Sequence, residues 1–146
     1  MLKSKAGTGP LAAYLRQSIA GMDRGRLVLA MYEEACLELH RALTDIPQHR
    51  LELAHRRLVK VQEIVNELLI SLNFEAGELS RTLRAIYQDL LQRLMTANLQ
   101  KDVALVTAVL NVLTDMKNAW GEMLQQLTRE VPPAGAKAAR LGSVRI

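Results

Sequence analysis

Residues 71–99 read SLNFEAGELSRTLRAIYQDLLQRLMTANL and contain the clearest break in the middle of the chain. Ser71, Asn73 and Gly77 cluster between two apolar runs, and such residues favour turns and helix ends. One helix should therefore end near Leu72. After the break, apolar residues recur every three or four positions, which places them on one helical face. They are Leu79, Leu83, Ile86, Leu90, Leu94 and Ala97. This pattern predicts a second helix that runs back along the first and ends near Asn98.

The helix before the break has the most regular pattern in the chain and is expected to begin near Arg50. Its apolar residues alternate three and four positions apart, as in the contact seam of antiparallel helices. They are Leu51, Ala54, Leu58, Val61, Val65, Leu68 and Leu72.

Two more long helices are predicted on either side of this pair. The first should start at Asp23, whose carboxylate can cap free backbone amides, and should end at Pro47. Its inward stripe is Val28, Met31, Ala35, Leu39, Ala42 and Ile46. The last should be capped by Asp102. Its seam is Val106, Val109, Leu113, Met116, Trp120, Met123 and Leu127, of which Trp120 is interpreted as a core residue.

Four helices of about 20 residues, each ~30 Å long and joined by short connections, predict an all-α fold. We expect an antiparallel up-down four-helix bundle with a short N-terminal helical flap from Pro10 to Ile19, which Gly21 should separate from the first long helix. The expected organisation is a disordered N-terminus at residues 1–9, a bundle domain at 10–130 and a flexible basic tail at 131–146.

Composition narrows the possible functions of this 146-residue chain. The net charge is +4, but Lys3, Lys5, Lys137, Arg140 and Arg145 stand in the end segments, while all 15 acidic residues lie between positions 10 and 130. The folded part therefore lacks the basic surface that nucleic acid requires. No segment has the ~20 apolar residues of a membrane span, and none resembles a signal peptide. We expect a soluble, cytoplasmic protein in which the single Cys36 is a buried thiol.

Residues suited to catalysis or metal binding are sparse. Glu52 and His55 form a Glu-x-x-His pair, but a di-metal bundle requires two such motifs and further inward-facing glutamates. His40 and His49 have no ligand cluster around them. We predict no metal, no cofactor and no enzymatic activity.

An alternative function centres on His55. The run AHRRLVK around it resembles the exposed histidine of phosphotransfer bundles, in which a nearby lysine stabilises the phosphorylated ring. Those proteins place Leu, Lys and usually Gly at two, three and four residues after the histidine. Here Arg57, Leu58 and Val59 occupy these positions, and Lys60 comes one residue late.

Apolar residues outside the predicted seams indicate a partner-binding surface. Each could fill the flank of a core stripe, because globular helices bury a stripe at least 100° wide. Together they offer more apolar area than the bundle needs, which is typical of a protein that binds another. The predicted partner-contacting residues are Tyr14, Leu91, Met95, Leu105, Leu110, Val112 and Met116.

Several motifs occur in one consistent register. They are Arg93-Leu94, Ala97-Asn98-Leu99, Asp102, Val109 and Ala119-Trp120, preceded by Tyr14, Ser18, LVLAMYEEA at 27–35, Ser71-Leu72-Asn73, Glu78-Leu79 and Tyr87. In this register the chain resembles the flagellar secretion chaperones of the FliS type from about residue 14 to 123. It departs from their pattern at Arg24, where proline is common, and at Met31, Glu33 and Glu34.

The resemblance implies a helical bundle that binds the disordered C-terminal segment of flagellin in apolar grooves and presents it to the flagellar export apparatus. It implies stoichiometric binding in the bacterial cytosol, without nucleic acid and without membrane insertion. A homodimer of the empty chaperone is also possible. The flap around Tyr14 is expected either to cover the empty groove as a lid or to pack permanently at one end of the bundle.

Overall fold

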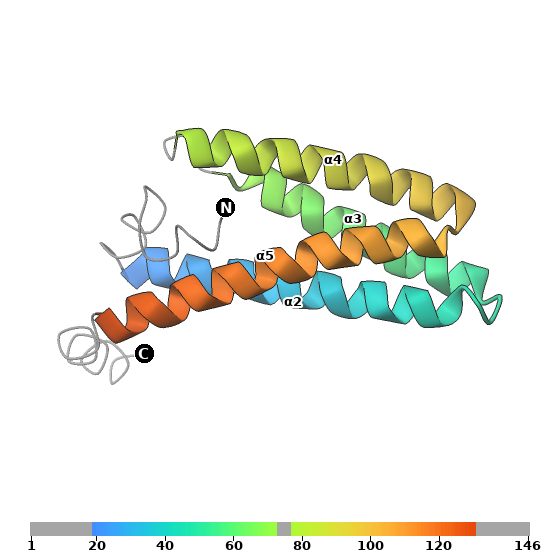
Figure 1. The fold of residues 1–146 in the computed structure, drawn as a ribbon, viewed down its shortest axis with the longest axis horizontal. Coiled ribbons are helices and arrows are strands. Elements are labelled where there is room, and N and C mark those ends of the chain that lie inside the picture. The colour runs from blue at the N-terminus through green and yellow to red at the C-terminus, as the bar shows by residue number, and fades with distance from the viewer. Residues whose placement is uncertain (1–18, 73–76, 131–146) are drawn as a thin grey trace.

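The computed structural model describes residues 19–72 and 77–130, which form four α-helices. They are α2 (Ile19–Asp45), α3 (Leu51–Ile70), α4 (Glu78–Gln100) and α5 (Val103–Glu130). Each helix packs against the next, and α5 packs back against α2, so the four helices surround the larger of two core clusters (Figure 1). The predicted helical bundle is confirmed. The flap at 10–18, the segment at 1–9 and the tail at 131–146 lie outside the described residues.

Residue contacts between helices define their directions. The start of α3 meets the end of α4, where His55 contacts Asn98. The start of α2 meets the later part of α5, where Gly25 contacts Trp120, and Cys36 of α2 lies beside Thr114 of α5. Successive helices therefore run in opposite directions along the long axis of the molecule (Figure 1).

The predicted seams make up most of the core. In α3, the buried residues are Ala54, Leu58, Val61, Val65 and Leu68. In α5 the whole predicted seam is buried except for Trp120, which is half-buried and packs against the core. Leu51 was predicted in the α3 seam but is 47% exposed, because it is the first residue of that helix and lies at the end of the bundle.

The start of α2 differs from the prediction. The helix begins at Ile19 and continues through Gly21, so the expected break at Gly21 and the expected cap at Asp23 are both wrong. Gly21 and Gly25 are buried, and the indole Nε1 of Trp120 donates a hydrogen bond to the Gly25 carbonyl at 2.8 Å. Burial of both glycines in the packed bundle offsets the roughly 1 kcal/mol helix penalty of each.

The turn between α4 and α5 follows the prediction closely. Lys101 adopts a left-handed conformation with φ of 52° and ends α4, and Asp102 precedes α5. The Leu105 amide donates to the Asp102 carboxylate at 3.2 Å, which confirms Asp102 as the cap. Gly77, with φ of 71°, precedes α4 at the other end.

Charged residues hold α2 against α3. Glu38 and Asp45 of α2 are buried, and the Arg57 guanidinium of α3 reaches both carboxylates, at 3.5 Å and 3.6 Å. Arg41 lies 3.1 Å from Glu38, and Arg50 lies 3.7 Å from Asp45. Because an unpaired buried carboxylate is costly, this group of charges also fixes the register of the two helices.

Candidate interaction surface

Helix α4 has two flanks that face different neighbours. The imidazole Nδ1 of His55 lies 3.0 Å from the Asn98 amide nitrogen, so Asn98 marks the flank of α4 that faces α3. Leu91 and Met95 precede Asn98 at helical spacing and lie on that same flank. Leu79 and Ile86 lie on the opposite flank, toward α5. The residues of α4 therefore belong to two separate surfaces.

Helix α5 also has two flanks, one that faces α2 and one that faces α4. Thr114 lies 3.8 Å from the Cys36 sulfur, and a Cβ at Gly121 would stand 3.8 Å from a Leu29 methyl, so both positions mark the flank that faces α2. Leu105 and Val112 lie on the opposite flank, toward α4. Both are half-buried and pack against the core.

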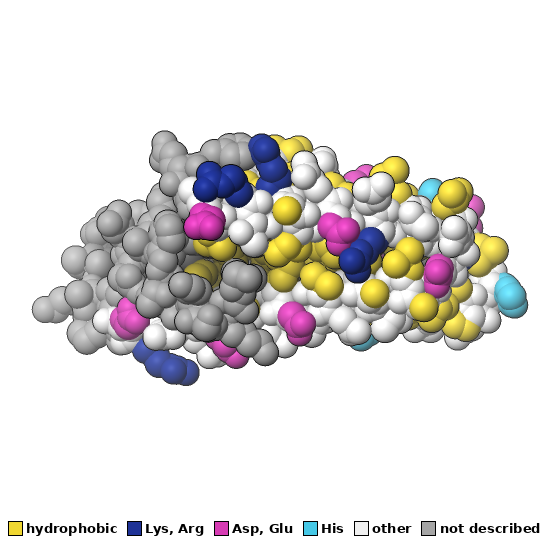
Figure 2. All heavy atoms as spheres, turned by 45° about the horizontal axis from the view of Figure 1, so that its top comes forward, with side chains coloured by type: hydrophobic (Ala, Val, Ile, Leu, Met, Phe, Trp, Pro, Cys, Tyr) yellow, Lys and Arg dark blue, Asp and Glu magenta, His cyan; other side chains and the backbone are white. Residues whose placement is uncertain are grey.

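The inner flanks carry Leu79 and Ile86 on α4 and Leu105 and Val112 on α5, which lie at different heights along the boundary between the two antiparallel helices and pack against the core. All four side chains are half-buried. Among neighbouring pairs of described helices, α4 and α5 share the least extensive contact. A band of hydrophobic side chains crosses the face of the molecule that these two helices make (Figure 2). We call this surface the α4/α5 seam.

A second apolar surface lies along the outer edge of the α3-facing flank of α4, on the side away from α5. Met95 is 59% exposed and Leu99, one turn later, is 85% exposed, the highest value among the exposed large hydrophobic residues of the described chain. Leu91, one turn before Met95, is half-buried. We call these three residues the outer ridge. Leucine and methionine side chains with this exposure are suited to contact another protein.

The predicted partner-contacting residues are therefore divided among several places. Leu105 and Val112 lie in the α4/α5 seam, and Leu91 and Met95 lie in the outer ridge. Leu110 and Met116 are core residues with exposures of 6% and 5%. Tyr14 is outside the described residues. Whether any of them contacts a partner stays a prediction.

Sequence reasoning did not select Leu99, Leu79 or Ile86 for this surface. Leu94 and Ala97 belong to the three-and-four repeat of α4 and are buried, whereas Leu99 falls outside this repeat. Its place in the sequence could therefore have predicted its exposure. Leu79 and Ile86 were assigned to the core stripe. They pack against the core but stay half-buried, because the contact between α4 and α5 is limited.

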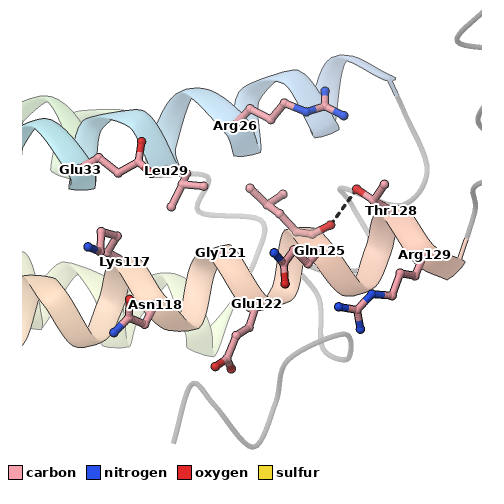
Figure 3. Close-up of a pocket in the computed structure, with 11 residues that line it drawn as sticks. Arg26, Leu29, Glu33, Lys117, Asn118, Gly121, Glu122, Gln125, Thr128 and Arg129 are labelled. Carbon is pink, nitrogen blue, oxygen red and sulfur yellow. Dashed lines mark hydrogen bonds between the residues drawn. The ribbon is translucent and has the colours of Figure 1, made fainter.

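A shallow depression of about 840 Å³ lies between α2 and α5. Figure 3 shows residues that line it, with Arg26 and Glu33 on α2 and Lys117, Gly121 and Arg129 on α5. Both signs of charge alternate around it. Its described lining residues neither enclose it nor direct their polar groups to one point, as a small-molecule site would require.

The alternative centred on His55 finds no support in the geometry. His55 is exposed, but its Nδ1 contacts Asn98 on the α4 side of α3. Lys60 lies on the other side, where its ammonium is 3.2 Å from Glu34 and 3.6 Å from Glu38. These interactions, first of all the hydrogen bond with Glu34, raise the pKa of Lys60. The lysine is therefore directed toward α2 and away from the His55 ring.

The described residues contain few other reactive groups. Burial raises the pKa of the Cys36 thiol, which disfavours the nucleophilic thiolate. Within residues 19–72 and 77–130, no three His, Cys, Asp or Glu side chains are grouped so that they could hold a metal ion. In the same part of the chain, no helix has the length and apolar character needed to cross a membrane.

Comparisons with known proteins show which family this helical bundle is similar to. A family model described as "Flagellar protein FliS" matches residues 7–127. The chain is 31% identical over 130 residues to the flagellar secretion chaperone FliS of Bacillus subtilis (strain 168). That alignment covers 88% of this chain and 96% of the Bacillus protein.

Proposed function

The chain belongs to the FliS family of flagellar secretion chaperones, a family of chaperones and not of enzymes, and from this premise we propose that its client is the C-terminal segment of flagellin. The protein binds this segment in the cytoplasm, prevents its premature polymerisation and presents it to the flagellar export apparatus. Binding is stoichiometric and involves no turnover.

The observation that carries this proposal is the apolar surface that the fold leaves uncovered on α4 and α5. The four residues of the α4/α5 seam are half-buried, and Met95 and Leu99 in the outer ridge are mostly exposed. An amphipathic client helix can place its apolar face on such surfaces, with anchor residues at helical spacing. Without a client, two copies of the protein pair through these same apolar side chains as a homodimer. The client then competes with the second copy for this surface.

The energetics suit a disordered client. At about 25 cal/mol per Å2, burying some 1,000 Å2 of apolar area gives on the order of 25 kcal/mol before costs. Ordering the client costs 2–5 kcal/mol or more, and association costs a further ~4–15 kcal/mol. The remainder is sufficient for a stable complex that another binding step at the export apparatus can still reverse.

The test is titration calorimetry with a flagellin C-terminal peptide of about 40 residues. We expect one-to-one binding with a large negative heat-capacity change, the sign of apolar burial. A Met95→Lys, Leu99→Lys variant should bind at least about tenfold more weakly, since it places two charges on the outer ridge. Leu27→Lys is the matched control, because Leu27 of α2 is exposed to the same degree as Met95, 61% against 59%.

The seam is tested separately with Leu105→Asp and Val112→Asp. Leu110 is unsuitable for this purpose, because an aspartate at a 6% exposed core position would destabilise the bundle. Far-ultraviolet circular dichroism should show unchanged helicity in each variant. Undiminished peptide binding by both the ridge and the seam variants would refute the proposed surface, and absence of binding by the unmodified protein would refute the proposed client.

A further inference from the structure

The C-terminal end of α4 is firmly tied to its neighbours. The Asn98 side chain contacts His55 of α3, and the Lys101 ammonium donates to the Asn98 carbonyl at 2.6 Å. The Asp102 amide donates to the Ala97 carbonyl at 3.1 Å, and the Asp102 carboxylate caps α5. A two-residue connection with this many hydrogen bonds holds the end of α4 at a fixed position against α5.

The N-terminal half of α4 packs on the larger core cluster, through the buried side chains of Leu83 and Tyr87, but not on the core residues near the end of α5. The described core residues form two clusters, and the smaller one consists of Met123, Leu124 and Leu127 of α5. The side chains packed against this cluster are Met22, Leu29 and Trp120, so it contains residues of α2 and α5 and none of α4. Figure 1 shows α4 and α5 diverging toward this end of the molecule.

A buried polar contact crosses the bundle at the middle of α4. The phenol oxygens of Tyr87 in α4 and Tyr32 in α2 are hydrogen-bonded to each other. Both side chains are at most 2% exposed. Separating them requires that each hydroxyl find another partner, so this pair opposes any movement of α4 away from the core.

From the fixed C-terminal end of α4 and its limited contact with α5, we propose that α4 is a pivoting helix whose closed position is held by the Tyr32–Tyr87 bond. Its anchored end at Asn98–Asp102 stays fixed, while its N-terminal half moves away from α5 and opens the α4/α5 seam. A client helix then enters between the two helices, where it contacts Leu79 and Ile86 as well as core residues that the closed bundle covers. This inference rests on the proposed function for the identity of the client, but the movement itself belongs to the empty protein.

Native-state hydrogen exchange of the client-free protein tests the movement directly. Amides of Leu83–Leu90 in α4 should be at least about tenfold less protected than those of Val106–Leu113 in α5, because a helix that has moved off its neighbours is only marginally stable and opens its own backbone hydrogen bonds without global unfolding. Equal protection of the two segments would overturn the pivot.

A reversible cross-link tests whether the client needs the opening. Asp89 and Asp115 are exposed residues on the two edges of the seam and are equally far along the chain from the Asp102 turn. We would replace both by cysteine in a Cys36→Ala background and join them with a cleavable bismaleimide. The locked protein should bind the flagellin peptide at least about tenfold more weakly, and cleavage of the linker should restore affinity.

The matched control joins the same two helices near the pivot. Thr96→Cys and Ala108→Cys lie close to the anchored end and take the same linker, and this protein should bind the peptide normally. Equal binding by both locked proteins would overturn the pivot as the route of entry. If the unlocked protein does not bind the peptide, the proposed function fails, and hydrogen exchange alone decides whether α4 moves.

Discussion

Replacing one tyrosine of the Tyr32–Tyr87 pair should destabilise the protein more than replacing both. The two hydroxyls are hydrogen-bonded in the core, and each ring is at most 2% exposed. Phenylalanine at either position removes the bond and leaves the other hydroxyl buried without its partner, which costs about 1–3 kcal/mol. Phenylalanine at both positions leaves two apolar rings of nearly the same shape and no unsatisfied group, and it should cost about 0–1 kcal/mol.

The assay is urea unfolding of the four proteins in this double-mutant cycle, followed by circular dichroism. If each single substitution lowers the free energy of unfolding by about 2 kcal/mol, the double variant should be about 3–4 kcal/mol more stable than the sum of the two single effects predicts. For a chain of this size, each single substitution should lower Tm by roughly 4–8 °C. Additive effects, or single costs below about 0.5 kcal/mol, would show that the hydroxyls are not held together in the core.

Three further predictions concern stability. Burial raises the pKa of Tyr32, and it raises the pKa of Tyr87 to about 12, above the usual value of 10.0. The unfolded chain therefore loses these protons first, and the protein should become easier to unfold as the pH rises from 10 toward 12. Urea midpoints that stay constant across this pH range would contradict the prediction. Asp102→Ala should cost about 1 kcal/mol in the same assay, because it removes the cap of α5, whereas Asp102→Asn should retain most of that stability. Gly121→Ala should raise stability by up to ~1 kcal/mol, since its Cβ would meet a Leu29 methyl at an ordinary 3.8 Å; a lower Tm would mean that α2 and α5 cannot accommodate it.

The helices and most of the core could be predicted because apolar spacing directly determines which residues share a face. Ala54, Leu58 and Val61 are all fully buried, as their alternation of three and four positions indicates. The start of α2 could not be predicted in this way. Glycine is a poor helix former in isolation, but Gly21 and Gly25 are buried in the bundle and Trp120 of α5 donates to the Gly25 carbonyl, so tertiary packing outweighs that weak propensity.

The interaction surface was harder to predict than the fold. The sequence identified α4 and α5 as the helices with surplus apolar residues, but it grouped Met95 with Val112 on one surface. The contact between His55 and Asn98 shows that Met95 lies on the α3 side of α4, while Val112 faces α4 from α5. Leu110 is buried because it precedes Thr114 by one turn on the flank that packs against α2. The handedness of the bundle determines which flank of a helix faces which neighbouring helix, and the spacing of apolar residues does not specify that handedness.

The charges between α2 and α3 have a consequence for how the chain is made. These helices are joined by a short turn and share the most extensive contact in the described bundle, and Arg57 bridges two buried acids, Glu38 and Asp45, seven residues apart on α2. Contacts between neighbouring segments form fastest. Since α2 and α3 leave the ribosome before α4 and α5 and their contacts are local, this hairpin should be the first part of the bundle to form, and it then provides the surface on which α4 and α5 fold.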